Sequence, residues 1–214
     1  LKKNIHVYRI DKMKKQLLIL FCFLFSMIVI GQKKSYTIGI LLDKKIEKIE
    51  PLLLQLQTQI IAVVGEDAEI IFSNENILAN NFDLTTAEQN YQKLINNSTH
   101  IILAFGVVNN KVLSNRKTYQ KPTILFGAVN KDFSDIDFTK KTSGIKNFTY
   151  LIESNSFLED FDTFKELTDF KTLGVAIESH LVDLLSLKEV FDEKFKKLKV
   201  DYKLIPFKTA SDIT

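Results

Sequence analysis

Acidic and imidazole side chains stand directly after two short apolar runs of the sequence. Asp43 follows the first run, and Glu178, Ser179 and His180 follow the second. A carboxylate in this position can pair with an ammonium group of a ligand, or it can cap the helix that follows and interact with its dipole. An imidazole can likewise contact a ligand or stay exposed in a loop. We favour the cap for Asp43 and exposure for His180, and keep both as binding candidates.

The residue types that common enzyme sites need do not occur together in this chain. Of its three histidines only His100 and His180 lie beyond residue 31, and its one cysteine is Cys22, so the clusters that hold zinc are missing. We find no glycine-rich phosphate loop, no dinucleotide fingerprint and no nucleophile elbow. His100, at the start of an apolar run, is expected to be structural. The sequence predicts a protein that is not an enzyme and needs no metal or cofactor.

The N-terminal residues have the pattern of an export signal. Met13 is followed by two lysines, by the apolar run 17–30 and by Gly31, which match the successive regions of a secretory signal peptide. We expect residues 1–12 to be upstream sequence that is not native, and residues 13–31 to be a signal peptide that is cleaved after Gly31. The mature protein would then be periplasmic.

The residues of this segment argue against two other interpretations. The apolar run is shorter than the about 20 residues of a comfortable membrane span, which argues against an uncleaved anchor. Cys22 follows the bulky Phe21 instead of a small residue, which argues against a lipoprotein attachment site. Cleavage would leave a mature chain without cysteine and therefore without disulfide bonds.

The charge balance gives no case for nucleic-acid binding. The formal net charge is +3, but the first 31 residues hold six of the 29 basic and one of the 26 acidic side chains. The remaining residues therefore carry 23 basic and 25 acidic groups, whereas a nucleic-acid-binding surface needs clustered basic residues. The lysines of residues 194–199 alternate with apolar residues and are expected to form a solvated helix face.

After Lys34, short apolar runs alternate with amphipathic segments, which is typical of a parallel α/β sheet flanked by helices. The continuously apolar run 36–42 suits a strand buried on both faces. The strands expected in this first lobe are 36–42, 68–72, 100–105 and 123–126. The helices expected between them are 46–63, which Gly65 ends, a helix from Asp83 or Thr85 to Ile95, and 109–117. In the second helix, Glu88 follows Thr85 at the spacing of a capping box.

An internal echo predicts a second lobe of similar plan. Residues 37–43 and 172–178 share one pattern, which is threonine, an apolar residue, glycine, three apolar residues and an acid. Each copy is followed by an amphipathic helix and a strand, and the second strand is 201–207. The apolar positions of the second helix are Leu184, Leu187, Phe191, Phe195 and Leu198. Chance similarity between buried strands is the alternative explanation.

The chain divides into two α/β lobes on these patterns. We assign residues 32–146 to the first lobe and residues 147–214 to a crossover and the start of the second. Residues 144–149 are expected to be extended and to cross between the lobes. The helix that leads into the second lobe carries Phe157, Phe161 and Phe164 as core residues. A capping signal at 211–214 predicts a further helix, so we expect the second lobe to be incomplete in this chain.

Ligands of open parallel sheets bind outside the carboxyl ends of the strands, near points where the strand order reverses. This rule selects the candidate ligand-binding residues Leu42, Asp43, Phe105, Gly106, Val107, Gly127, Ala128, Val129, Glu178, Ser179 and His180. At Gly106 and Gly127, the missing side chain would let backbone amides approach a ligand. Alternatively, the turns at these two glycines need unusual backbone angles.

The order of these elements resembles that of ABC-transporter substrate-binding proteins with the type I periplasmic-binding fold, in the branch that includes aromatic amino-acid binders. The similar segments are 38–43, 101–106, 122–132 and 143–145. The third is the most specific, because a proline, a buried strand and a small-residue turn precede an acid. Members of this family usually place a small hydroxyl residue after the glycine of the third strand, where it helps to hold a ligand. Here Val107 and Val108 follow Gly106, which implies a more apolar ligand or a loss of binding.

The resemblance implies an exported, two-lobed protein that closes around a small molecule, such as an amino acid or another compact apolar solute, and delivers it to an ABC permease. A second resemblance offers an alternative. Similar domains stand at the front of outer-membrane efflux channels in Bacteroidetes-like bacteria, where this chain would be a periplasmic interaction or sensing domain. The partners expected are a small-molecule ligand and either a permease or the efflux machinery.

Overall fold

The computed structural model describes residues 33–126, 136, 137, 140, 142–152 and 157–212. The predicted upstream residues 1–12 and the predicted signal peptide 13–31 lie outside these residues. Within the described ranges, no helix combines the length and the hydropathy that a membrane crossing requires.

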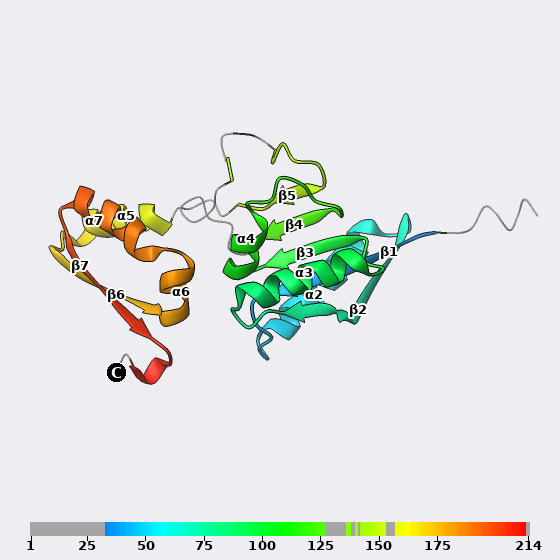
Figure 1. Ribbon diagram of the computed structural model, residues 1–214, viewed down its shortest axis with the longest axis horizontal. Helices are drawn as coiled ribbons and strands as arrows, with labels where there is room; N and C mark the ends of the chain where they lie inside the picture. Colours follow the sequence, from blue (N-terminus) through cyan, green and yellow to red (C-terminus); the bar gives the residue numbers. More distant parts are fainter. Residues whose placement is uncertain (1–32, 127–135, 138–139, 141, 153–156, 213–214) are drawn as a thin grey trace, which may run out of the picture.

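Five parallel strands form the sheet of the first lobe (Figure 1). Their spatial order is β2 (Ala68–Ala79), β1 (Lys34–Leu42), β3 (Ile101–Phe105), β4 (Thr123–Phe126) and β5 (Phe148–Tyr150). The chain passes from β1 to β2 on one side and then returns to place β3 on the other side. The strand order therefore reverses at β1, and the ends of β1 and β3 are the expected location of a ligand.

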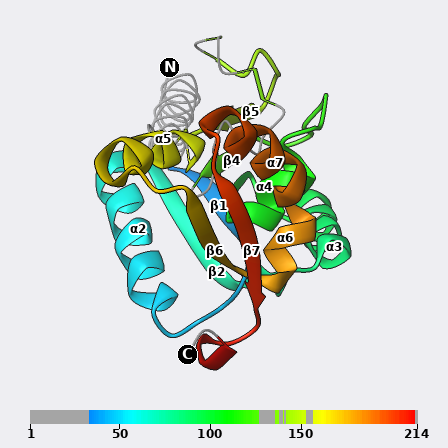
Figure 2. The ribbon, with the colours of Figure 1, turned by 90° about the vertical axis from the view of Figure 1, so that its left-hand side faces the viewer.

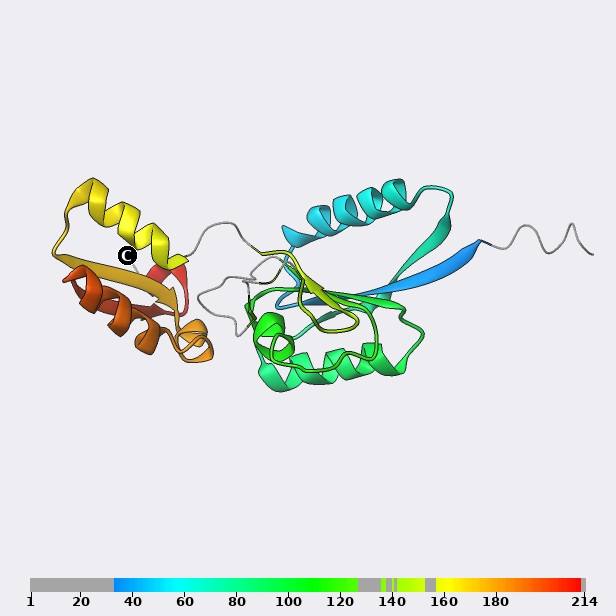
Figure 3. The ribbon, with the colours of Figure 1, turned by 90° about the horizontal axis from the view of Figure 1, so that it is seen from above.

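Helices cover both faces of this sheet (Figure 3). One face carries α2 (Ile49–Val64), and the other carries α3 (Leu84–Asn96) and α4 (Val107–Leu113). The buried side chain of Ile40 belongs to the apolar cluster under α2, whereas the next side chain, Leu41, belongs to the cluster under α3. Because its side chains enter both clusters, β1 needs the continuous apolar run that the sequence shows.

Gly39 lets α3 approach β1 closely. A Cβ atom at this position would lie 2.7 Å from Cδ1 of Leu94 and 3.0 Å from Cγ2 of Thr99, so both side chains would have to move. At the echoing glycine, Gly174, a Cβ would meet Cδ1 of Ile205 at 3.0 Å. Close packing therefore requires the glycine in the first copy, whereas Gly174 is exposed and meets only the end of a side chain that is itself 40% exposed.

The second strand is longer than expected. The sequence predicts its end at Phe72, but β2 continues to Ala79 beyond an irregularity in its pairing with β1, where Ile38 pairs with Phe72 and Ile40 with Ile77. The polar residues 73–76 at this irregularity interrupt the apolar pattern and conceal the rest of the strand. One of them, Asn76, is buried and accepts a hydrogen bond of 2.8 Å from Asn97.

The expected apolar stripe of α2 is only partly buried. Leu53 is buried, but Val63 is 85% exposed, and Ile46 lies outside the helix and is 48% exposed. Gly65 follows the last residue of α2 with a φ of +60° and a ψ of −126°, a backbone region that favours glycine, so the expected helix end is confirmed. On the other face, α4 begins two residues before the expected Asn109 and ends at Leu113.

The N-terminus of α3 is capped by Asp83, the first of the two expected candidates. Its carboxylate accepts a hydrogen bond of 2.6 Å from the backbone N–H of Thr86, and these contacts hold the pKa of Asp83 below its ordinary value. Thr85 lies inside the helix. The expected capping box is therefore wrong, and Glu88 contacts Gln92 and Arg116 instead.

The second lobe contains a separate two-stranded parallel sheet, in which β6 (Thr172–Glu178) and β7 (Asp201–Phe207) lie side by side (Figure 2). Its other elements are α5 (Phe157–Thr168), α6 (Ser179–Leu184), α7 (Leu187–Leu198) and the 3-10 helix η1 (Ala210–Asp212). The strand predicted from the echo is confirmed by β6, and the strand predicted at 201–207 is confirmed by β7.

Aromatic side chains fill the core of the second lobe. Phe191 and Phe195 of α7 are buried, and the ring centroid of Phe161 lies 5.6 Å and 4.8 Å from theirs. The helix expected through residues 184–198 is broken, because Ser186 takes a φ of +48° and separates α6 from α7. Leucines on both sides of the break keep the helical spacing, so the pattern conceals it.

Residues 144–149 do not cross between the lobes, which corrects the expectation. Gly144 has a φ of +68°, and β5 pairs with β4 as the edge strand of the first sheet. The ring of Phe148 stacks on Tyr119 with a centroid distance of 4.3 Å. Only residues 148 and 149 of the expected extended segment belong to a strand, because 144–147 form bends and turns, and Asn147 has a φ of +62°.

Candidate functional site

The carboxyl ends of β1 and β3 lie beside each other, because the two strands are hydrogen-bonded neighbours. Asp43 follows β1, and Gly106 separates β3 from α4. The carboxylate of Asp43 accepts hydrogen bonds from the backbone N–H groups of Val108, at 3.0 Å, and Asn109, at 3.2 Å. Asp43 thus caps the N-terminus of α4, where a negative charge is favourable.

The sequence correctly predicts a capping role for Asp43 but names the wrong helix. The helix that follows Asp43 begins only at Ile49, and its N-cap residue, Lys48, makes no capping side-chain bond. Two amide side chains complete the surroundings of the carboxylate, since Nδ2 of Asn80 donates to it at 3.0 Å and Nδ2 of Asn109 at 3.2 Å. Three of these four donors bond to Oδ1 and only the Val108 N–H bonds to Oδ2, so the acceptor position that remains for a ligand lies on Oδ2.

Gly106 is required by both its backbone angle and its surroundings. Its φ is +95°, and a Cβ atom would lie 2.3 Å from the carboxyl carbon of Asp43. The group that approaches this glycine closely is therefore the internal carboxylate. Of the two interpretations of Gly106, the unusual backbone angle is confirmed.

A cavity of about 430 Å³ opens at this edge of the sheet. It is lined by Leu42, Asp43, Lys44, Ile46, Phe82, Phe105 and Gly106 around the strand ends and by Ile49, Leu52, Leu53 and Leu56 of α2. Eight of these eleven residues are apolar, which is typical of sites for small molecules. Four of the predicted binding residues line it, namely Leu42, Asp43, Phe105 and Gly106, whereas Val107 does not.

A second hollow of about 500 Å³ lies between α2 and β2. Its lining includes Glu50, Leu54, Gln57 and Asn74, and it contains none of the predicted binding residues. The hollow lies away from the end of β3, and its walls are more polar. We therefore take the cavity at the ends of β1 and β3 as the candidate site.

Phe82 belongs to this cavity but is absent from the sequence-based set. It follows β2, whose end lies beside the end of β1, and Asn80 holds it in place by accepting a hydrogen bond of 2.8 Å from the Phe82 N–H. The same rule on carboxyl ends would have selected Phe82 if the second strand had been traced to Ala79. The polar residues 73–76 prevented this.

The predicted binding residues of the second lobe do not line the cavity. Oγ of Ser179 donates a hydrogen bond of 3.0 Å to the carbonyl oxygen of Phe207 and joins the ends of β6 and β7. Nε2 of His180 lies 3.5 Å from a carboxylate oxygen of Glu178. The His180 ring also reaches the first lobe, where its centroid lies 4.2 Å from that of Phe82.

The remaining candidates lie elsewhere or outside the described residues. Gly127, Ala128 and Val129 belong to the part of the chain that is not described. His100 accepts a hydrogen bond of 3.0 Å from the N–H of Thr37 through Nδ1, which agrees with a structural role. Across the described ranges, no group of three or more His, Cys, Asp or Glu side chains is placed to hold a metal ion.

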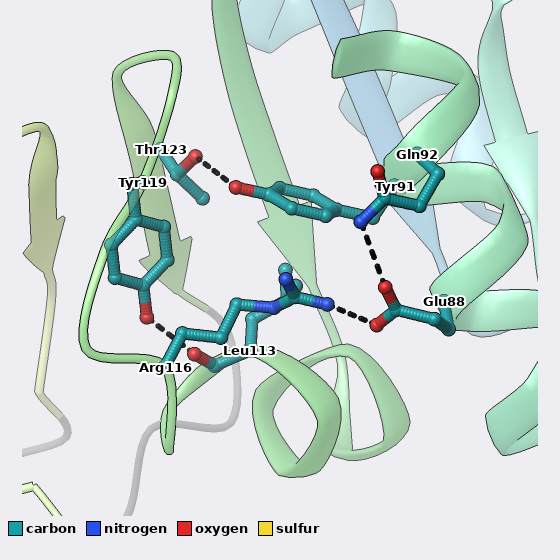
Figure 4. A network of polar contacts seen from close by, with 7 residues as sticks. All are labelled: Glu88, Tyr91, Gln92, Leu113, Arg116, Tyr119 and Thr123. Carbon is teal, nitrogen blue, oxygen red and sulfur yellow. Dashed lines mark hydrogen bonds and ion pairs between the residues drawn. The ribbon is translucent and has the colours of Figure 1, made fainter. Parts of the chain in front are cut away.

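A polar network joins α3, the end of α4 and the start of β4 (Figure 4). Arg116 pairs with Glu88, and its guanidinium carbon lies 4.6 Å from the ring centroid of Tyr91. Burial would raise the pKa of Glu88, but hydrogen bonds from Arg116 and Gln92 outweigh it and leave that pKa below its ordinary value. Burial raises the pKa of the Tyr91 hydroxyl. This network lies at the amino end of β4, away from the cavity, and its role is structural.

Comparisons with known proteins place the fold. No protein-family model matches the chain, and no curated relative matches it. An ABC domain in complex with L-Trp from Streptococcus pneumonia is similar in structure, with a TM-score of 0.54 and 16% identity over 84% of this chain. A fatty acid ABC transporter substrate-binding protein from Thermomonospora curvata has a TM-score of 0.56 and 14% identity over 83% of this chain.

The chain spans 60% and 46% of the lengths of these two structures. At such low identity the likeness establishes the fold, which is the type I periplasmic-binding fold predicted from the sequence, with a parallel sheet flanked by helices.

Proposed function

We propose that this chain is part of a solute-binding protein that holds a small, largely apolar molecule at the carboxyl ends of β1 and β3. The observation that carries the proposal is the apolar cavity, which lies where open parallel sheets bind ligands. Leu42, Phe82 and Phe105 form part of the cavity wall. The fold neighbours support the proposal, because L-Trp and fatty acids both carry a large apolar group.

The charged residues at the cavity indicate which chemical class of ligand it would accept. Asp43 already accepts three internal hydrogen bonds at Oδ1 and one at Oδ2, so a ligand amino group could add about one further bond, at Oδ2. Lys44 is exposed at the cavity and forms no ion pair with any residue in the described ranges. An apolar body with an anionic end fits this arrangement, because the chain supplies most of the donors to its own carboxylate and leaves a cation available.

We further propose that the segment 13–31 exports the protein to the periplasm and that an ABC permease receives the solute after the two lobes close. Closure requires that the ligand bind the closed state more tightly than the open state. In the described residues, the ring of His180 in the second lobe contacts the ring of Phe82 in the first, and lobe closure would change this contact. The alternative role at the front of an efflux channel gains no support from the comparisons, and we do not propose it.

A thermal-shift screen tests the binding function. The panel contains L-Trp, L-Phe and medium-chain fatty acids, with L-Ser, L-Asp and ribose as polar compounds of similar or smaller size. A ligand at about 100 times its Kd should add about 2.7 kcal/mol to the free energy of unfolding. We expect the melting temperature to rise with apolar members only. A response limited to the polar compounds, or no response in the whole panel, would contradict the proposal.

A further inference from the structure

Phe82 contacts both the cavity and the second lobe. It lines the apolar cavity together with Leu42 and Phe105. It also contacts His180 of the second lobe, with ring centroids 4.2 Å apart and ring planes inclined by 42°. One side chain therefore separates the proposed ligand from a residue of the other lobe.

The backbone at Phe82 has a conformation that large side chains rarely adopt. Its φ is +64°, and the preceding Asn81 has a φ of +52°. A bulky residue in the left-handed region is strained and persists only where its surroundings determine it. Here the strained pair places an aromatic ring at the rim of the cavity.

The same carboxylate that caps α4 also holds this turn. The side chain of Asn80 is buried, donates to Asp43 at 3.0 Å and accepts from the Phe82 N–H at 2.8 Å. The Phe82 N–H also lies 3.3 Å from the carbonyl oxygen of Asp43. The base of the turn is thus fixed to the strand ends that form the cavity, while the Phe82 ring is only half-buried.

We propose that Phe82 transmits occupancy of the cavity to the second lobe. An apolar molecule in the cavity contacts the Phe82 ring from one side and restricts it to the position on which His180 packs. Binding and the interlobe contact then stabilise each other, and this coupling is reciprocal. The inference rests on the proposed function, because it needs a ligand in this cavity.

A substitution at His180 distinguishes coupling between the cavity and the second lobe from direct contact with the ligand. His180 does not line the cavity, yet its removal should weaken binding, since the bound state loses the contact that it favours. We expect His180→Ala to reduce affinity about fivefold, at the lower end of the usual range for coupled sites. Asp183→Ala, on the same helix and exposed, should leave affinity unchanged.

Nuclear magnetic resonance of the full chain tests the coupling with indole as the probe. The chain has three histidines, so His180→Gln assigns the His180 ring protons directly. Methyl labels on leucine and isoleucine report the cavity through Leu42, Leu52 and Leu56, none of which lines the second hollow. We expect indole to shift these methyl signals and the His180 ring signals together. His100, which lies beside Tyr36 at the other end of the sheet, should not respond.

The possible outcomes distinguish the two proposals. Cavity methyl shifts with an unmoved His180 would overturn the coupling and leave the binding function intact. No shift at either place would overturn both. In Phe82→Leu, which keeps an apolar wall but removes the aromatic ring, the methyl signals should still respond while the His180 response disappears. A retained His180 response in that variant, or an unchanged affinity in His180→Ala, would also contradict the role of Phe82.

Discussion

The carboxyl carbon of Asp43 lies 2.3 Å from the position that a Cβ atom on residue 106 would occupy, so the side chain of Asp43 fills the space that Gly106 leaves empty. This relationship joins the ends of β1 and β3 and lets Asp43 reach the first N–H groups of α4. An internal carboxylate thereby satisfies a helix terminus at the edge of the candidate cavity. The cavity that remains is apolar.

Gly106→Ala should destabilise the first lobe strongly. The new methyl group would meet the Asp43 carboxyl, and the residue would keep a φ of +95°. Strain and overpacking together predict a loss of about 2–4 kcal/mol in the free energy of unfolding, measured in urea. Gly144→Ala is the matched control, because Gly144 also has a positive φ but a Cβ there meets nothing within 4 Å. Equal losses in the two variants would show that the Asp43 approach is not the cause.

Leu52→Glu should weaken the binding of apolar ligands without unfolding the protein. Leu52 lines the cavity and is 60% exposed, so a glutamate there can stay hydrated while it places a negative charge beside the ligand. We expect affinity to fall at least tenfold, which corresponds to about 1.4 kcal/mol. Titration calorimetry with the strongest ligand from the screen measures this change.

Leu54→Glu is the control for that substitution. Leu54 lies on the same helix, is 66% exposed and faces the second hollow instead of the cavity. It should change the charge of the helix by the same amount and leave affinity intact. If both variants lost affinity equally, the ligand would not be bound specifically at the ends of β1 and β3.

Glu88→Gln should reduce the dependence of stability on acid pH. The pKa of Glu88 is lower in the folded protein than its ordinary value of 4.5, so its ionised form stabilises the fold above that pH. This contribution is lost as the pH falls through the folded pKa. Its size is below about 1 kcal/mol, because the Glu88 side chain is 42% exposed.

Urea unfolding at pH 7 and at about pH 3 measures this contribution as the difference between wild type and Glu88→Gln. Arg116→Met removes the partner and should diminish the pH dependence in the same way. An unchanged acid dependence in both variants would show that the ion pair has no energetic role.

The sequence predicts elements well where the apolar pattern is unambiguous. Continuous runs identify β1, β3 and β4, because strands in a covered parallel sheet need apolar residues in succession, whereas the internal echo identifies β6, whose residues alternate between exposed and half-buried. The prediction fails where local pattern and tertiary packing differ. Polar residues 73–76 conceal the second half of β2, and the leucine spacing across Ser186 conceals the break between α6 and α7.

Prediction of the candidate site from the sequence is likewise only partly correct. The rule on carboxyl ends selects Leu42, Asp43, Phe105 and Gly106, which line one cavity. The partner of Asp43 could not be predicted, because α4 is adjacent to it only through the pairing of β1 with β3. Phe82 could not be predicted for a different reason. Its place in the cavity depends on the true end of β2, which the polar residues 73–76 conceal.

Mapping the binding position of the strongest apolar ligand by methyl shifts of the wild-type chain is the most direct test of the central claim. We expect the shifts to concentrate on Leu42, Leu52 and Leu56, which line the cavity at the ends of β1 and β3 and not the second hollow. Shifts that instead concentrate on Leu54 and Ile77, in the second hollow between α2 and β2, or an absence of saturable shifts, would contradict it.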